Sequence, residues 1–437
     1  MRLTDDDSIS RTSTNNARCI AAYGSVVHVV WHDYRFGGPQ IFYKRSIDWG
    51  NTWHGDDRLT SSSGFPVDPS IAVWGYTVHV VWQDNYAGNS EIYYKCSTDH
   101  GMSWEGDIRL THYEGISGWP SIAVSNNDIH VTWYDFRDGH PEIYYKHSTN
   151  SGITWSLDKR LTNSYGASTK PCIGVSDSTV HVAWTYSRDS ISVIHYKHST
   201  NNGITWSADT CLTDVTDIAR YPSIAVSDNI VHLVWQDETD YNTEIFYMQS
   251  TDAGVTWGAA IRLTYTVDDS RTASIAADSN NVHIVWSDYR NGNYEIYYKR
   301  SLDNGTYWEN DERLTNQIEM SYHPSVATSG EYVHVVWTDL QDDNEEIYYR
   351  NNPKGSIGAT SEAILMHLHE YVPIPNPFRL FTTVPGRERE IYRVYDIAGK
   401  FMNTCTSDCI GNTLKEGVYF LFPEKYSTVP IKIIKVR

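Results

Sequence analysis

A repeat of 51 residues constrains this chain more than any other feature of its sequence. The stretch VHVVW ends at Trp31 and at Trp82, and each later variant follows after another 51 residues with no insertion. The stretches end at Trp31, Trp82, Trp133, Trp184, Trp235, Trp286 and Trp337. Self-similarity at such a period indicates repeated units that bury a continuous core by packing on one another.

Each unit contains four short runs that alternate as β-strands do. The second unit has PSIAV (69–73), TVHVVWQD (77–84), EIYYKCS (91–97) and, after a loop, IRLT (108–111). Four strands in about 40–50 residues are typical of one blade of a β-propeller. The repeat therefore predicts seven blades of 51 residues.

The two ends of the repeat predict how the ring closes. The seventh unit stops after EIYYRNNPKG without its loop or its RLT, and a spare RLT stands at Arg2–Thr4. We therefore expect the N-terminal segment to supply the outer strand of the last blade. The predicted fold is all-β: a seven-bladed propeller over residues 1–355, a linker at 356–374 and a small β-sandwich at 375–437.

The loop between the third and fourth runs has the pattern Ser-x-Asp-x-Gly-x-Thr-Trp, as in STDAGVTW from Ser250. This pattern, present six times, resembles the Asp-box, or BNR repeat, of sialidase-like propellers. Its Asp or Asn accepts backbone N–H bonds across the turn, and its Gly permits positive φ. We expect these loops to be structural staples, with the acceptor at Asp48, Asp99, Asn150, Asn201, Asp252 and Asp303.

Composition narrows the choice of partners. The net charge of −19 argues against nucleic-acid backbones and anionic membranes. No apolar run approaches the roughly 20 residues that span a bilayer. The six cysteines lack metal-ligand spacing, so we expect no metal site and no cofactor, with Ca²⁺ in the carboxylate-rich loops left open.

Positions that differ among similar blades are the better candidates for binding a ligand. The residue before each inner strand varies most, and Arg18, Arg220 and Arg271 stand beside it in three units. Mixed aromatic and charged groups suit a sugar at the channel mouth, although they could also be ordinary loop residues. The candidates are Asp68, Trp119, Lys170, Tyr221, Arg220, Arg271 and His323.

The loop between the second and third runs provides a second group of candidates. An Asp stands two residues after the Trp in six units, and Glu precedes the third run in five. The carboxylates could cap turns and pair with arginine, or they could form a ring that faces a sugar or a cation. The arginines of this group are Arg35, Arg137, Arg188 and Arg290. The fourth unit departs from the pattern, with Tyr186 for Asp and Val193 for Glu.

The histidine of each VHxxW stretch is expected to be structural. Packed sheets lie about 10 Å apart, so equivalent histidines of neighbouring blades cannot share one metal ion at a ligand distance of about 2 Å. The seven are His28, His79, His130, His181, His232, His283 and His334.

The resemblance to sialidases implies an arginine triad, a tyrosine nucleophile backed by Glu, and an Asp acid/base. The family's Arg-Ile-Pro signature is absent; ARCIAA (17–22) and RYPSIA (220–225) are weak echoes. The regular period also leaves little room for the unlike loops that a catalytic site needs. We therefore assign no catalytic residue. The leading hypothesis is a propeller that binds a glycan or another extracellular ligand; the alternatives are an exo-sialidase or other glycoside hydrolase, and a structural or protein-interaction surface protein.

The C-terminal segment carries PNPFRLFTTVPG, YRVYDIAGK, LKEGVYFLF and IKIIKVR in that order. It resembles the C-terminal sorting domain of the type IX secretion system. The resemblance implies export, with the secretion machinery as partner and a secreted or surface-attached product. No export signal stands at the N-terminus of this sequence. An extra docking domain is the alternative, and a Cys405–Cys409 disulfide stays open.

Overall fold

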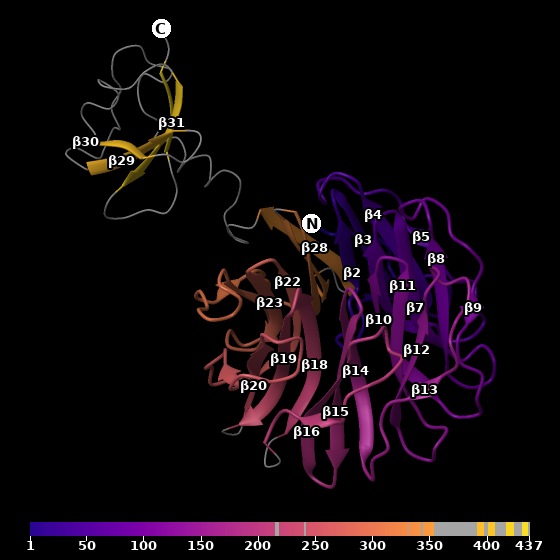
Figure 1. Cartoon of the computed structure of the whole chain (residues 1–437). Coiled ribbons are helices and arrows are strands. Elements are labelled where there is room, and N and C mark those ends of the chain that lie inside the picture. Colours follow the sequence, from indigo (N-terminus) through magenta and orange to yellow (C-terminus); the bar gives the residue numbers. More distant parts are fainter. Residues whose placement is uncertain are drawn as a thin grey trace. The chain divides into compact units, whose positions relative to one another are not determined.

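The computed structural model of the chain describes residues 1–214, 218–239, 242–330, 332–341 and 344–353, and four strands beyond them. Two compact units result, Met1–Gly358 and Ala359–Arg437. The first is a ring of seven antiparallel sheets (Figure 1). Among the described residues no helix is long and apolar enough to cross a membrane.

The first four blades contain the following strands. Blade 1 has β1 (Ser10–Arg11), β2 (Ile20–Tyr23), β3 (Val26–Asp33), β4 (Gln40–Ser46) and β5 (Asp57–Arg58); blade 2 has β6 (Val67–Trp74), β7 (Thr77–Asp84), β8 (Glu91–Ser97) and β9 (Ile108–Arg109); blade 3 has β10 (Ser117–Ser125), β11 (Asp128–Asp135), β12 (Glu142–Ser148) and β13 (Lys159–Arg160); blade 4 has β14 (Ala167–Ser176), β15 (Thr179–Arg188), β16 (Ile191–Ser199) and β17 (Thr210–Cys211).

The remaining blades follow the same order. Blade 5 has β18 (Ala219–Ser227), β19 (Ile230–Thr239), β20 (Asn242–Ser250) and β21 (Ile261–Arg262); blade 6 has β22 (Ser270–Asp278), β23 (Asn281–Asp288), β24 (Glu295–Ser301) and β25 (Glu312–Arg313); blade 7 has β26 (Ser321–Ser329), β27 (Tyr332–Asp339) and β28 (Glu346–Pro353). The predicted seven-bladed, all-β propeller is confirmed.

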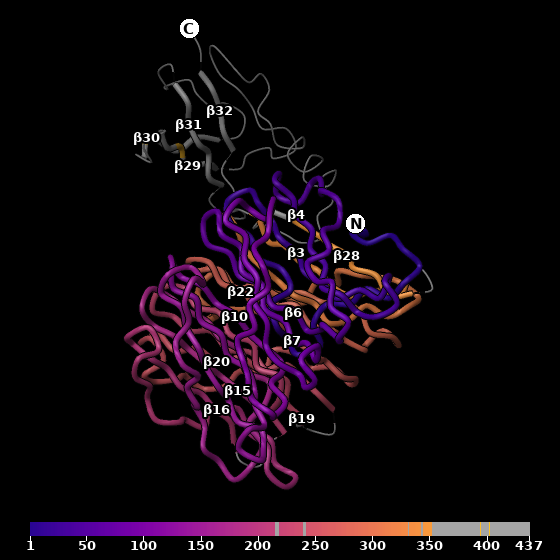
Figure 2. Tube along the Cα trace, turned by 90° about the vertical axis from the view of Figure 1, so that its right-hand side faces the viewer, coloured from indigo at the N-terminus to yellow at the C-terminus, as the bar shows by residue number. Residues whose placement is uncertain are grey.

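The N-terminal segment completes blade 7, as the spare RLT predicts. Arg2 bridges to Tyr348 of β28, and the Leu3 amide donates to the Ile347 carbonyl at 2.7 Å. In both views of the chain the N-terminus lies beside β28 (Figures 1 and 2). Leu3 packs with Trp31 and Tyr349, so its side chain joins the last blade to the first.

The core lies between neighbouring blades. The second strand of a blade is buried on both faces, as in β3, where every side chain is buried. Trp133 of blade 3 packs with Val81 and Tyr94 of blade 2. Each blade packs one face of its sheet on the preceding blade and the other face on the following blade. Residues that point to either face of its inner strands are therefore mostly apolar.

The Asp-box loops close their own turns with hydrogen bonds and also contact the preceding blade. In blade 2 the Asp99 carboxylate accepts the Ser103 amide at 2.9 Å, and Ser97 Oγ accepts the Gly101 amide at 2.8 Å. The hydrogen bonds that Asp99 accepts, led by the one from the Ser103 hydroxyl, lower the pKa of Asp99 to about 2. Gly101 lies against the hydroxyl end of the Tyr43 side chain of blade 1, and Trp104 packs edge-on against the Tyr43 ring at 4.8 Å.

The second unit contains one described sheet, in the order β30-β29-β31-β32. Its strands are β29 (Ile391–Asp396), β30 (Phe401–Thr406), β31 (Gly417–Pro423) and β32 (Ile431–Lys435). The remainder of the predicted sandwich, the linker at 356–374 and Cys409 lie outside the described residues.

Candidate functional site

A β-bulge begins the inner strand of blades 2 to 7, at the positions where the sequence varies most. In β10 the pairing register shifts between Gly118 and Ser121. The bulged residue has positive φ, an uncommon conformation for a residue with a side chain, and the bulge re-aims that side chain. The residues are Asp68 (51°), Trp119 (50°), Lys170 (55°), Tyr221 (56°), Thr272 (52°) and His323 (51°).

The preceding blade holds the bulge in place. The Trp119 amide donates to Gln83 Oε1 at 2.8 Å, and the Thr272 amide donates to Gln236 Oε1 at 3.0 Å. Side chains that project from the bulges are therefore fixed relative to the neighbouring sheet.

Three of the predicted residues come together across blades 3, 4 and 5. Lys170 Nζ lies 3.5 Å from the centre of the Tyr221 ring and 5.7 Å from that of Trp119. The Trp119 ring packs edge-on against Tyr134 at 5.1 Å. Burial, reinforced by Arg220, lowers the pKa of Lys170 to about 8. We call Trp119, Lys170 and Tyr221 the aromatic–lysine cluster.

A loop of blade 1, residues 12–18, occupies the channel mouth. Ser10 pairs with Asp33, a separation of 23 residues, whereas Ser117 pairs with Asp135, a separation of 18. Blade 1 therefore has five extra residues in its inner strand, and the expectation that the repeat has no insertion is wrong there. The spacing of the tryptophans could not reveal them because they precede Trp31.

Contacts of residues 12–18 reach four other blades. The Asn16 amide group donates to the carbonyls of Tyr221 and Ala273, each at 3.1 Å. The Thr14 amide and hydroxyl donate to Asp68 Oδ1 at 3.0 and 2.9 Å. Asp68 thus anchors the loop, and burial raises the pKa of its carboxyl.

The other predicted mouth residues have individual partners. The Thr12 hydroxyl donates to the His323 carbonyl at 2.8 Å, and burial lowers the pKa of the His323 ring. Arg271 pairs with Asp269 at 2.6 Å, and Arg220 lies 3.8 Å from Glu238.

Three of the four loop arginines are held in ion-pair networks. Arg137 donates to Asp135 on its own loop and to Asp158 at 2.8 Å, and its guanidinium stacks on the Tyr144 ring at 4.2 Å. Burial alone would raise the pKa of Asp135, but the hydrogen bonds from Arg137 lower it. Arg35 and Arg290 repeat this arrangement. The geometry favours the turn-capping interpretation for all three.

Arg188 differs from these arginines. Its side chain is 60% exposed and lies 3.8 Å from the exposed carboxylate of Asp189. It stands at the end of an extended hairpin in blade 4, away from any network of this kind.

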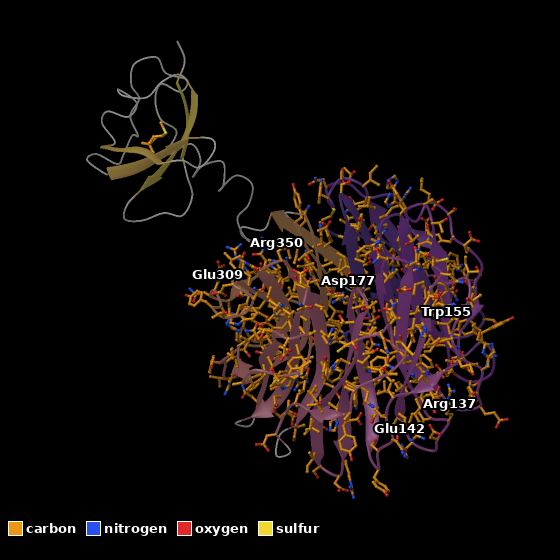
Figure 3. The ribbon with its side chains drawn as sticks, in the orientation of Figure 1. Arg137, Glu142, Trp155, Asp177, Glu309 and Arg350 are labelled. Carbon is orange, nitrogen blue, oxygen red and sulfur yellow. The ribbon has the colours of Figure 1, made fainter. Side chains whose placement is uncertain are left out.

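The glutamate before the third strand forms a clamp with the RLT run. In blade 3, Arg160 donates to Glu142 at 2.8 Å, and the Thr162 hydroxyl donates to the same carboxylate. Figure 3 labels Glu142 beside Arg137 at one edge of the propeller. Blade 4 lacks both charges, with Val193 for Glu and Cys211 for Arg.

One constellation at the mouth was not predicted. The Tyr322 hydroxyl donates to Glu345, which also accepts Arg11 Nε. Burial, followed by Glu345, raises the pKa of Tyr322, so its phenol stays protonated. The doublet Glu345–Glu346 was the available signal, because the other units have no acidic residue before the conserved position.

The described residues contain no group of three His, Cys, Asp or Glu side chains close enough to hold a metal ion.

Comparison with known proteins identifies the repeat. Residues 122–335, from β10 to β27, match the BNR repeat-like domain. Polysaccharide lyase Uly1 shares the fold with a TM-score of 0.54 and 12% identity, covering 77% of this chain and 90% of that chain.

Two sialidases are more distant. The NanB sialidase of Streptococcus pneumoniae has a TM-score of 0.45 and 14% identity, covering 81% of this chain and 70% of that chain. Trypanosoma rangeli sialidase has a TM-score of 0.47 and 10% identity, covering 90% and 66%. No curated protein matches the chain in sequence. The chain carries BNR-type repeats within its propeller.

Proposed function

We propose that the aromatic–lysine cluster binds an acidic carbohydrate at the face of the propeller that carries the bulges. The observation that carries this proposal is Lys170, a partly buried cation with no carboxylate partner among the described residues. Arg35, Arg137 and Arg290, by contrast, each have two or more carboxylates.

The chemistry of the cluster fits a sugar acid. Aromatic rings stack on the C–H face of a pyranose, and an ammonium group pairs with a carboxylate. In the free protein the ammonium group of Lys170 lies over aromatic rings, which attract it weakly. A bound carboxylate would form a stronger ion pair with this group and would raise the pKa of Lys170. Sialic and uronic acids both have the required ring and anion.

A glycan array probed with the full chain tests the proposal. We expect acidic glycans to bind, and we expect Trp119→Ala and Lys170→Met each to weaken binding at least tenfold. Tyr76→Ala, which removes an exposed ring at the turn between β6 and β7, is the control and should bind as the wild type does. Absence of acidic glycans among the hits would reject the proposal.

Glycoside hydrolysis is the second candidate, and the Tyr322–Glu345–Arg11 constellation favours it. A tyrosine bonded to a carboxylate beside an arginine has the groups for nucleophilic attack on a sugar acid. The test is release of 4-methylumbelliferone from its sialic acid and uronic acid glycosides. Turnover that Tyr322→Phe abolishes would support an enzyme, whereas no turnover with bound glycan would leave a binding protein.

We further propose that the chain is exported through its C-terminal segment and acts outside the cell or on its surface. The support is the order of the motifs in residues 375–437. Joining these residues to an exported reporter in a bacterium with type IX secretion tests this: the reporter should reach the medium or the surface, and retention in the periplasm would contradict it.

A further inference from the structure

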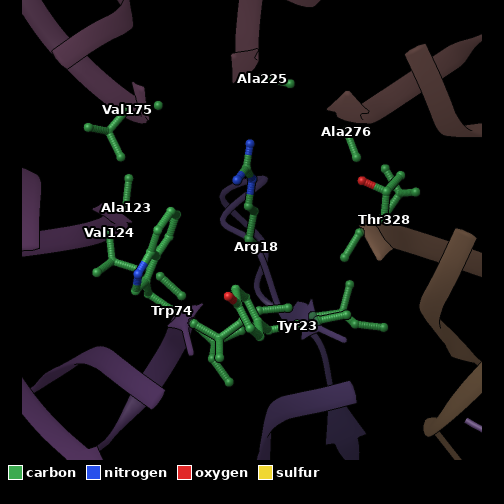
Figure 4. A pocket seen from close by; sticks show the side chains of 18 of the residues that line it. Arg18, Tyr23, Trp74, Ala123, Val124, Val175, Ala225, Ala276 and Thr328 are labelled. Atoms are coloured by element: carbon green, nitrogen blue, oxygen red, sulfur yellow. The ribbon is translucent and has the colours of Figure 1, made fainter. Parts of the chain in front are cut away.

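The side chains that line the central channel are mainly aliphatic. The inner strands of all seven blades contribute small side chains to a cavity of about 310 Å³, within the range of ligand pockets. Alanine and valine dominate, as at Ala123, Val124, Val175 and Ala225 (Figure 4). Residues 12–18 cover the end of this channel at the bulge face, as described above.

Arg18 is the single charged residue of this wall. It follows the loop of residues 12–18, and its carbonyl accepts the Ile71 amide at 2.9 Å, which fixes its backbone on β6. Its side chain extends into the centre of the channel (Figure 4), where Nη2 donates to the Ile224 carbonyl of blade 5 at 2.7 Å. Of the five N–H groups of a guanidinium, this satisfies only one.

No carboxylate pairs with Arg18 among the residues that the structure describes. Burial accordingly lowers the pKa of Arg18, because desolvation outweighs every favourable charge near it. A partly exposed cation in a narrow channel, without a counter-charge, favours an anion in the cavity.

The opposite end of the channel is open to solvent. Tyr23 and Trp74 line it with half-exposed rings whose centres lie 6.1 Å apart. The hollow beyond them includes Asp228 and Asp278. These two carboxylates stand at the entrance, where they disfavour ions with several negative charges.

We propose that the central channel is a second binding site, for a small monoanion with an apolar body, whose carboxylate pairs with Arg18. The carboxylate would accept two N–H bonds from the guanidinium, and its hydrocarbon part would replace water along the Ala and Val wall. This site is separate from the aromatic–lysine cluster and does not depend on the function proposed for that cluster.

Calorimetric titration of the full chain with octanoate tests the proposal. Octan-1-ol and octylamine have the same chain without the anion, and propionate has the anion without the chain. We expect octanoate to bind at least tenfold more tightly than each of these three.

Variants locate the bound anion. Arg18→Met removes the charge at similar size, and Ala22→Phe fills the channel while keeping Arg18; both should weaken octanoate binding at least tenfold. Arg58→Met, on the exposed strand β5, is the control for loss of an arginine and should bind normally. Ala22→Phe keeps the test informative if Arg18→Met does not fold. Failure of the wild type to bind octanoate, or equal binding by folded Arg18→Met, would overturn the proposal.

Discussion

The buried histidine of each blade makes the same contact all around the ring. Its Nδ1 lies 2.6–2.8 Å from the hydroxyl of the tyrosine fifteen residues later, as in His130 and Tyr145. Burial lowers the pKa of His28, His130, His181 and His334 to about 3. These histidines are neutral structural groups at physiological pH.

Their lowered pKa values make the propeller sensitive to acid. Because the unfolded chain takes up protons near pH 6.5 and the folded chain only near pH 3, this contribution to stability is complete above pH 6.5 and is lost as the pH falls through that window. His130→Gln should lower the free energy of unfolding at pH 7, because the contact with Tyr145 is lost. Below pH 6.5 it should also make the fall of that free energy with pH less steep, by about 1.4 kcal/mol per pH unit. Urea unfolding at pH 7.0 and 5.5 measures this, and an unchanged slope would contradict it.

The glycine of each Asp-box is constrained by space as well as by φ. Gly101 has a φ of +77°, and a Cβ there would lie 1.9 Å from Tyr43 Oη. Gly37 has a similar φ of +81° with nothing within 4 Å. Gly101→Ala should cost about 3 kcal/mol or more, and Gly37→Ala only about 1–2 kcal/mol from backbone strain. Equal losses in thermal unfolding would show that the contact with Tyr43 is unimportant.

At the scale of the element, the clamp between the third and fourth strands reinforces the pairing of the short outer strand. Arg160 lies opposite Tyr144 in the register, and its guanidinium reaches Glu142, which is fully buried. Blade 4 lacks both the Glu and the Arg, so a blade can retain this strand pair without the charges.

Because of the clamp, we expect substitutions of Glu142 and Arg160 to have non-additive effects on the free energy of unfolding. Glu142→Val should cost about 3 kcal/mol because it removes the acceptor of Arg160 and Thr162. Glu142→Val with Arg160→Cys reproduces the blade 4 combination and should cost at least about 1 kcal/mol less than the two single losses added together. A double-mutant cycle on the free energy of unfolding gives the coupling, and strict additivity would exclude the clamp.

At the scale of the whole molecule, the ring depends on its first residues. Tyr349 donates its amide to the Met1 carbonyl at 2.8 Å, and Leu3 is 4% exposed. Deleting residues 1–4 should destabilise the propeller by roughly 4 kcal/mol, because a buried leucine and several strand hydrogen bonds are lost. Asp5→Ser with Asp7→Ser, which changes only exposed charges, should melt as the wild type does. A normal melting temperature for the deletion would rule out closure by this segment.

Sequence reasoning captured features that repeat and missed those that occur once. The spacing of the tryptophans and the spare RLT predict the blades and their closure, because every unit repeats the same contacts. The extra residues of blade 1 are visible only when SRTSTNNARCIAA (10–22) is aligned with SRTASIAA (270–277). That alignment makes Arg11, and not Arg18, the counterpart of Arg271, and it leaves Arg18 in the channel.

The candidate site residues divide into those whose neighbours follow from the repeat and those whose partners do not. Trp119, Lys170 and Tyr221 come together because equivalent bulges of adjacent blades are neighbours. The partners of Arg35, Arg137 and Arg290 include Asp56, Asp158 and Asp311, which lie 21 residues further along each unit. The Asp two residues before each arginine is a local signal for pairing, as in Asp135 and Arg137, but the second, distant carboxylate is not visible in the loop.

The most direct test of the account is the affinity of the full chain for acidic and neutral oligosaccharides, measured by calorimetry at pH 7. A sialyllactose and a glucuronate disaccharide serve as acidic ligands, and lactose serves as the neutral one. We predict that the wild type prefers at least one acidic ligand by tenfold or more and that Lys170→Met loses this preference. Because Lys170 loses its charge, the preference should decline as the pH rises past about 8. Equal affinity of the wild type and Lys170→Met for every acidic ligand, or no binding at all, would contradict the account.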